Sequence, residues 1–189
     1  MSIEQGHILL QIARSAISNA LGQPLGAPAD TPWLQAAGAT FVTLTQAGEL
    51  RGCIGTLEAH RPLLDDVKAN ALAAAFRDPR FPPLRHAELS YTLIEVSLLS
   101  ANEPIAFESE QHALAQLRPG VDGLIFEYGH FRSTFLPQVW EQLPDPEIFM
   151  AHLKRKAGLA PNFWATGVKL ARYTVTKWKE PASSEEKIA

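Results

Sequence analysis

The same order of predicted elements occurs twice along the chain, and this repetition constrains the fold more than any other feature. In the first half, a hairpin around a turn at 46–49 is followed by a helix from Pro62, a proline-rich loop and a strand. The second half has a hairpin, a helix beginning at Pro144 and a strand in the same order. Two related β-α units would explain this order, and a coincidence between two ordinary hairpins is the alternative.

The two hairpins also align residue by residue. Residues 43–55 can be laid over 124–136 without a gap, which brings Arg51 to Arg132 and Cys53 to Thr134. A duplicated fold therefore predicts that the two arginines occupy equivalent places in their hairpins. The strands at 91–96 and 173–178 align one residue out of step.

Helix and strand periodicities complete the expected fold. Apolar residues at three- and four-residue spacing predict a helix over 3–21, and a short helix is expected at about 109–117. Antiparallel hairpins followed by helices predict an α+β fold with a mixed or antiparallel, barrel-like sheet, flanking helices and two internal β-α repeats. We expect a single domain over 1–189, built from repeats at about 6–100 and 105–180, with a polar tail at 181–189.

Composition excludes several classes of protein. The net charge of -3 and the pI near 6.1 give no basic footprint for nucleic acid and no polybasic membrane anchor. The N-terminus lacks the pattern of a signal peptide, and no apolar run approaches the ~20 residues that span a bilayer. One cysteine fits a reducing compartment, so we expect a cytoplasmic protein that binds neither nucleic acid nor membrane.

The single cysteine lies in the stretch Arg51-Gly52-Cys53-Ile54-Gly55. Glycines on both sides would let a substrate approach the thiol closely, and strand alternation puts Arg51 on the same face, where it could stabilise a thiolate. Free cysteine is also among the most buried residue types, and the glycines could simply allow close packing. Cys53 is therefore either a nucleophile supported by Arg51, or a small core residue.

Two further stretches carry candidate site residues. The loop at 77–83 places Arg77, Asp78 and Arg80 among three prolines, which could hold the charges rigidly beside the hairpin. A capping aspartate with solvated arginines is the alternative. Glu95, in the middle of an apolar strand, needs a charged partner unless it lies at an edge or in water.

The remaining reactive side chains show no motif. The six histidines lack metal-ligand spacing, so no metal site is expected, and the sequence identifies no cofactor. Four aromatic residues of the second half are expected in the core, with a binding platform as the alternative: Trp140, Phe149, Phe163 and Trp164.

Several long segments together resemble a known family. They are "LRGCIGTLE", "AAFRDPRFPPL" and "GVDGLIFEYGHFRSTFLPQVWEQLPDPEIFMAHLKRKAGL", followed by "YTV" near the end. In this order, over about residues 6–180, they are similar to the AMMECR family in its prokaryotic form, AmmeMemoRadiSam system protein A. The resemblance implies an α+β barrel-like sheet containing two repeats, which agrees with the internal duplication.

The resemblance also implies where function resides. The "LRGCIG" motif, Leu50 to Gly55 here, is the part that the family is taken to use, and the system's name implies a Memo-like protein and a radical SAM protein as pathway partners. The candidate catalytic residues are Cys53, Arg51 and Glu95. The candidate binding residues are Gly52, Gly55, Arg77, Asp78, Arg80 and Arg132. We expect an enzyme or enzyme subunit acting on a small anionic or thiol-reactive substrate, or a non-catalytic adaptor that docks a partner through this motif.

Overall fold

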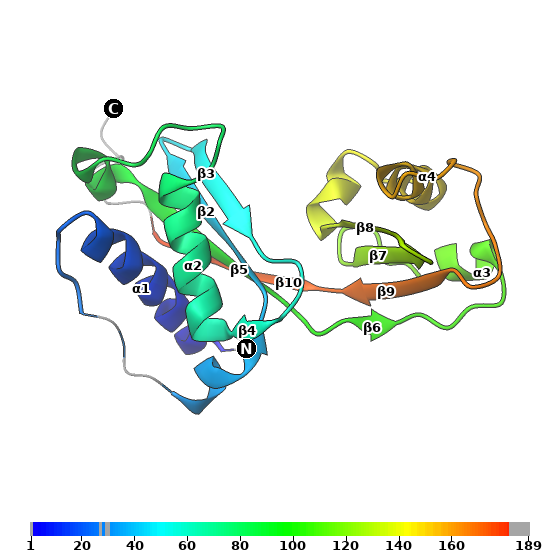
Figure 1. The fold of residues 1–189 in the computed structure, drawn as a ribbon, viewed down its shortest axis with the longest axis horizontal. Coiled ribbons are helices and arrows are strands. Elements are labelled where there is room, and N and C mark those ends of the chain that lie inside the picture. Colours follow the sequence, from blue (N-terminus) through cyan, green and yellow to red (C-terminus); the bar gives the residue numbers. More distant parts are fainter. Residues whose placement is uncertain (1, 27, 29–30, 182–189) are drawn as a thin grey trace. The chain divides into compact units, whose positions relative to one another are not determined.

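The computed structural model describes residues 2–26, 28 and 31–181 as two units (Figure 1). The first unit contains the chain up to Leu99 together with the segment from Thr176 onward. The second unit contains Ser100–Val175. Helices and antiparallel strand pairs occur in both, which confirms the predicted α+β fold, although neither four-stranded sheet closes into a barrel within the described residues. The single-domain organisation stays a prediction.

The first unit is built on a four-stranded sheet. Its strands lie in the order β10-β5-β2-β3. They span Thr40–Gln46 (β2), Glu49–Gly55 (β3), Leu93–Leu99 (β5) and Val175–Lys179 (β10). Strand β2 pairs antiparallel with both β3 and β5, so β3 is left as an edge strand.

Two helices, α1 (Ile3–Ala20) and α2 (Leu63–Phe76), pack against one another and against this sheet. Alternate residues of the central strands, including Val42, Leu44 and Ile94, are fully buried in the core with the apolar sides of both helices. Alternation in a strand then directs the residues between them to the opposite face. Two of the candidate catalytic residues, Cys53 and Glu95, lie on that opposite face.

Short elements connect these parts of the first unit. They are the 3-10 helices η1 (Pro32–Gln35) and η2 (His86–Tyr91) and the paired two-residue strands β1 (Ala37–Gly38) and β4 (Arg61–Pro62). The proline-rich loop at 77–85 therefore runs from the end of α2 to η2. Pro62 is the residue before α2 and its fixed φ of -52° suits the entry into the helix.

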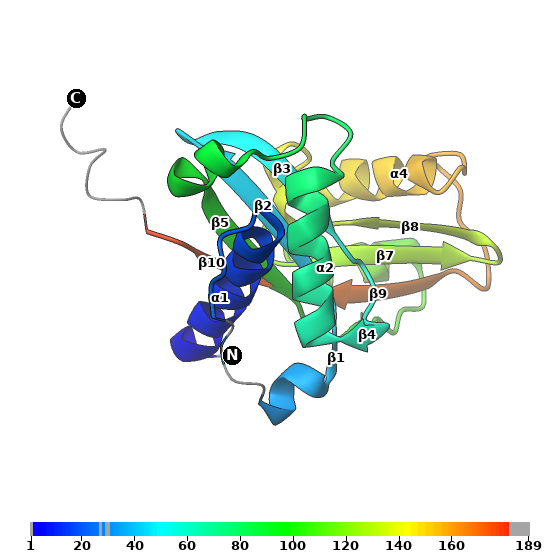
Figure 2. The ribbon, with the colours of Figure 1, turned by 60° about the vertical axis from the view of Figure 1, so that its left-hand side comes forward.

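The second unit has a sheet in the order β6-β9-β7-β8. Its elements are β6 (Glu103–Pro104), α3 (Glu110–Leu114), β7 (Gly123–Tyr128), β8 (Phe131–Phe135), η3 (Pro137–Glu141), α4 (Pro146–Lys156) and β9 (Lys169–Tyr173). Figure 2 shows α4 lying along β8. The rings of Trp140 and Phe149 stack 3.7 Å apart in the core between them, whereas Phe163 and Trp164 pack partly buried at its border.

The topology confirms the internal repeat. In each unit a hairpin is followed by a helix, and a later strand returns to pair antiparallel with the first strand of the hairpin. The returning strand of the second unit is β9, because it pairs with β7 as β5 pairs with β2. The predicted match of 91–96 with 173–178 is therefore wrong, and β10 instead joins β5 in the first sheet.

The predicted equivalence of Arg51 and Arg132 is also wrong. The first turn consists of Ala47 and Gly48, so its glycine is in the second position, whereas Gly129 is in the first position of the second turn. An alignment of the two glycines therefore shifts the two hairpins by one residue relative to one another. A β-bulge in the first hairpin leaves Arg51 as the extra residue, and this restores the register. Beyond the bulge, Cys53 and Thr134 are equivalent as predicted. Cys53 pairs with Thr43 and Thr134 pairs with Ile125, and each of these partners is the fourth residue before the turn of its hairpin.

Two expectations concern the ends and the membrane. Apart from Pro181, the predicted polar tail lies outside the described residues. Among the helices of the described ranges, none has the length and apolar character needed to cross a membrane.

Candidate functional site

Glycine at position 52 is required by the approach of α2 to the edge strand. A Cβ on Gly52 would lie 2.2 Å from the backbone oxygen of Ala74 in that helix. Gly52 therefore faces α2, and Cys53, the next residue, faces the other side of the sheet. A Cβ on Gly55 would lie 2.2 Å from the ring of Phe41 on that other side. Both glycines thus have a packing reason beside any role in binding.

Cys53, Thr43 and Glu95 form a polar row across the face of the sheet away from the helices. Thr43 lies between Cys53 and Glu95 in the ladder and pairs with both, and its Oγ1 donates a hydrogen bond of 3.3 Å to Cys53 Sγ. Because neighbouring strands lie about 4.8 Å apart, the Cys53 and Glu95 backbones are about 10 Å apart on one face. Glu95 in turn lies 4.0 Å from Lys177 Nζ. The thiol is half-buried.

The loop after α2 holds the backbone of Cys53 from the open edge of the sheet. The Cys53 N–H donates to Asp78 Oδ2 at 2.9 Å, and the Cys53 carbonyl accepts from Arg80 Nη2 at 3.2 Å. The two side chains therefore replace the backbone partners that a neighbouring strand would supply. These bonds confirm the prediction that the loop at 77–83 lies beside the hairpin at Cys53.

Asp78 and Arg80, which together form a clamp on the Cys53 backbone, also pair with one another. Asp78 is buried and also accepts from the Arg80 N–H, Nε and Nη2, at 3.1, 2.9 and 2.7 Å. The hydrogen bonds from the Arg80 side chain, aided by those from the Cys53 and Arg80 N–H groups, hold the pKa of the Asp78 carboxyl well below its ordinary value. The carboxylate therefore stays charged across the physiological pH range.

Arg51 does not share the environment of the thiol. The bulge interrupts strand alternation at Arg51, so the expectation that it faces the same way as Cys53 no longer holds. Its guanidinium is buried and donates from Nε and Nη2 to the carboxylate of Glu88, at 3.0 and 3.3 Å. This bond from Arg51 is the main reason why the pKa of Glu88 is lowered. Arg51 therefore joins the hairpin to η2.

The two other candidate arginines belong to other elements. Arg77 is exposed at the C-terminal end of α2. Arg132 belongs to the second unit, where it donates from Nε to Glu127 at 2.6 Å across the β7–β8 ladder. Of the predicted site residues, the structure thus joins Cys53, Asp78 and Arg80 by hydrogen bonds and adds Glu95 on the same sheet face.

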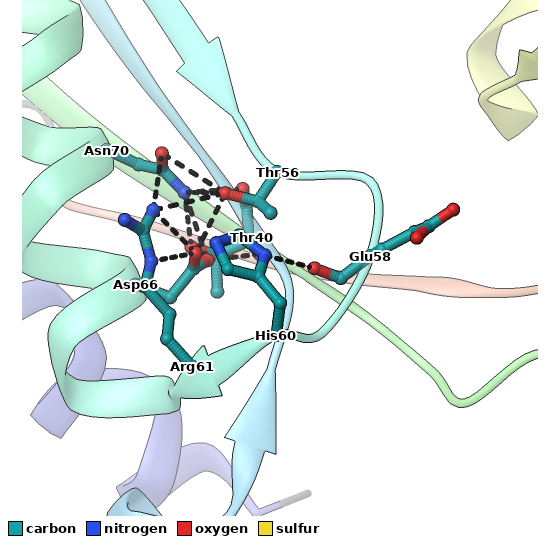
Figure 3. Close-up of polar contacts among 7 residues, drawn as sticks. All are labelled: Thr40, Thr56, Glu58, His60, Arg61, Asp66 and Asn70. Carbon is teal, nitrogen blue, oxygen red and sulfur yellow. Dashed lines mark hydrogen bonds and ion pairs between the residues drawn. The ribbon is translucent and has the colours of Figure 1, made fainter.

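A buried polar network, absent from the sequence-based predictions, fixes the open end of the same hairpin (Figure 3). Asp66, fully buried in the first turn of α2, accepts from the N–H and Oγ1 of Thr40 at 2.8 and 2.7 Å, from Thr56 Oγ1 at 2.8 Å and from Arg61 Nε at 2.8 Å. Asn70 adds a bond to the Thr40 carbonyl at 2.9 Å. Thr40 begins β2 and Thr56 follows β3, so the network anchors both strands to the helix.

The edge of this network reaches the loop between β3 and β4. In Figure 3, Glu58 lies on that loop, and its carbonyl is 2.9 Å from Nδ1 of His60. No group of three or more His, Cys, Asp or Glu side chains that could hold a metal ion occurs within residues 2–26, 28 and 31–181.

The arrangement combines one half-buried thiol, a hydroxyl that donates to it and a carboxylate on the same face. Its backbone is fixed from the edge by Asp78 and Arg80, and from the hairpin end by the network around Asp66. Such a thiol can attack an electrophile, because the groups around it are polar and held in place. The same surface could also dock a protein.

Comparison with known proteins identifies the family. The family model AMMECR1 matches residues 10–178. Protein MJ0810 of Methanocaldococcus jannaschii is 37% identical over 185 residues, which cover 95% of this chain and 92% of that protein. A protein of Methanothermobacter thermautotrophicus is 42% identical over 167 residues, which cover 86% of each chain.

A solved structure shows the same fold. The crystal structure of the uncharacterized protein PH0010 from Pyrococcus horikoshii has a TM-score of 0.79 to this chain at 34% sequence identity. The match covers 96% of this chain and 94% of that one. The chain therefore belongs to the AMMECR1 family.

Proposed function

We propose that the protein is an enzyme, or a subunit of a multi-protein enzyme, that uses Cys53 as a nucleophile. The substrate is a small anionic or thiol-reactive molecule. The observation that carries this proposal is the clamp on Cys53: a buried carboxylate binds its N–H and an arginine binds its carbonyl. Burying a charged group costs free energy unless it is well paired, so the use of a buried carboxylate to hold the backbone of Cys53 supports a requirement for a precisely placed thiol.

The other residues of the row have distinct roles in this proposal. Thr43 donates a hydrogen bond to Sγ and holds the sulfur in position for attack on an electrophilic centre of the substrate. Glu95 exchanges protons with the substrate on the same face. The guanidinium of Arg80 is half-exposed beside Cys53 and provides the contact for an anionic group.

The pathway and the compartment are also proposals. The resemblance to AmmeMemoRadiSam system protein A supports action together with a Memo-like protein and a radical SAM protein. A single cysteine that must stay reduced supports a cytoplasmic location.

A non-catalytic adaptor is the second candidate. Leu50 and Leu57 are large apolar side chains that remain 42% and 38% exposed at the two ends of the edge strand. Exposed apolar residues around a polar centre are typical of a docking surface. In this case Cys53 would contact the partner without reacting.

A complementation experiment separates the two functions. A strain that lacks the gene is given the wild-type protein, Cys53→Ser or Leu50→Glu, and its small metabolites are profiled. The enzyme proposal expects that Cys53→Ser fails to restore the profile while its free energy of unfolding stays within about 1 kcal/mol of wild type. Full restoration by Cys53→Ser would overturn it.

If the protein is a non-catalytic adaptor, the two variants should give the opposite results. Leu50→Glu would then abolish co-purification with the Memo-like or radical SAM protein, and Cys53→Ser would leave the metabolite profile intact. Glu49→Gln, an exposed polar change in the same hairpin, serves as the matched control for both readouts.

A further inference from the structure

The second unit contains a cavity of about 640 Å³ that is separate from the residues around Cys53. One wall is formed by 104–108, which begins in β6, and the other by 164–170, which leads into β9 (Figure 1). The backbone bond from Ile105 N–H to Leu170 O, at 2.9 Å, joins the two walls. A cavity of this size suits a small organic molecule.

Two aromatic side chains provide the apolar surface of the cavity. The rings of Phe107 and Trp164, one from each wall, lie 5.4 Å apart and are inclined by 55°. Both are partly buried against the core of the unit. Further apolar residues of both walls belong to the lining: Pro104, Ile105, Ala165, Val168 and Leu170. A flat or bulky apolar group would fit against these rings.

Trp164 is held in place from the core side by a buried lysine. Lys154 of α4 is 1% exposed, and its Nζ lies 5.3 Å from the centre of the Trp164 indole. The same ammonium forms an ion pair with Glu110 and lies 3.4 Å from the Pro161 carbonyl. A buried ammonium is expensive to desolvate and needs such partners. The indole is thereby fixed before any ligand binds, which lowers the entropic cost of binding.

Each wall of the cavity carries one charged residue, and the two have opposite signs but form no ion pair among the described residues. Glu108 lies on the first wall and Lys169 on the second, and both are exposed. Neither side chain has a hydrogen bond or an ion pair within the part of the chain that the structure describes. Each wall therefore carries one exposed charged residue, of opposite sign to the other, near the two aromatic rings.

We propose that this cavity binds a small zwitterion, an α-amino acid with an aromatic or large apolar side chain. Lys169 contacts the carboxylate of the ligand, Glu108 contacts its ammonium group, and its side chain lies against Phe107 and Trp164. A single molecule that contacts both residues needs an anionic group for Lys169 and a cationic group for Glu108, and an α-amino acid carries both. This inference is independent of Cys53 and of the function proposed above.

An NMR titration of the full ¹⁵N-labelled chain tests the proposal. The probe is L-phenylalanine at millimolar concentrations, compared with 3-phenylpropionate and 2-phenylethylamine, which each lack one of its two charges. We expect amide shift changes confined to 104–108, 164–170 and their neighbours. Each analogue should bind at least about fivefold more weakly, as expected for the loss of one partly exposed ionic contact.

Matched variants assign the two charges. Lys169→Gln should abolish the preference for L-phenylalanine over 2-phenylethylamine, and Glu108→Gln should abolish the preference over 3-phenylpropionate. Lys179→Gln, an exposed lysine of the first unit, should change neither preference. Shift changes that are absent or lie outside the two walls would overturn the proposal, as would equal affinity for all three probes.

Discussion

Replacing Asp78 by alanine should destabilise the first unit through the loss of the clamp on Cys53. The change removes the acceptor of the Cys53 N–H and the partner of Arg80. A hydrogen bond from a backbone N–H to a buried carboxylate contributes about 1.5–3 kcal/mol. The ion pair adds at most about 1 kcal/mol, because the Arg80 side chain is 52% exposed. We therefore expect Asp78→Ala to lower the free energy of unfolding by about 2–4 kcal/mol.

Urea unfolding monitored by tryptophan fluorescence measures this loss, and its pH dependence identifies the cause. The pKa of Asp78 is lower in the folded protein than in the unfolded chain. Its contribution is therefore fully present above the unfolded value, near 3.9, and disappears as the pH falls toward the folded value. The difference between wild type and Asp78→Ala should be constant from about pH 8 to pH 5 and should shrink below about pH 4.

The reasoning fails if Asp78→Ala costs less than about 0.5 kcal/mol, the range of an ordinary surface substitution. It also fails if the difference already disappears near pH 6, since a carboxylate of lowered pKa remains charged there. Glu49→Gln controls for the loss of one negative charge from the same hairpin, and it should leave the unfolding free energy within about 0.5 kcal/mol of wild type.

Two further changes test the packing and the network around the hairpin. Gly52→Ala should cost at least about 2–3 kcal/mol, because its Cβ meets a backbone oxygen of α2. Gly55→Ala should cost less, because its Cβ meets a side chain, Phe41, which can shift more readily than the backbone of a helix. Equal losses of both variants in thermal unfolding would show that this explanation is wrong. Asp66→Ala should cost about 3–5 kcal/mol, because it leaves Arg61 and the Thr40 N–H without their buried acceptor. A loss below about 1 kcal/mol in urea unfolding would contradict the importance of this network.

The sequence was sufficient to predict the elements of the fold because the relevant signals are local. Helical periodicity, glycine turns and prolines determine where the helices and hairpins of both units begin and end. The return of β10 to the first sheet is a pairing between distant segments, and no local pattern indicates it. The repeat suggested a place for this strand in the second unit, where β9 is found instead.

The site was predictable where it depended on residue type and unpredictable where it depended on register. Cys53 and the loop bearing Asp78 were identified from their unusual composition, and they do meet. The pairing of Arg51 with Glu88 was not predicted, because a bulge is not visible in the alternation of apolar and polar residues. Asp66 and Asn70 carried a signal that was available, since both are polar at four-residue spacing within an apolar helix.

The accessibility of the Cys53 thiol in the folded protein is the central claim, and its rate of alkylation by iodoacetamide tests it most directly. The chain has one cysteine, so the labelled mass reports Cys53 alone. The proposal predicts that the native protein is labelled at neutral pH at a rate comparable to that of the same chain unfolded in urea, because a nucleophilic thiol must be open to reagents from solution. A native thiol that stays unlabelled until the protein unfolds would contradict the proposal and leave Cys53 as a packing residue.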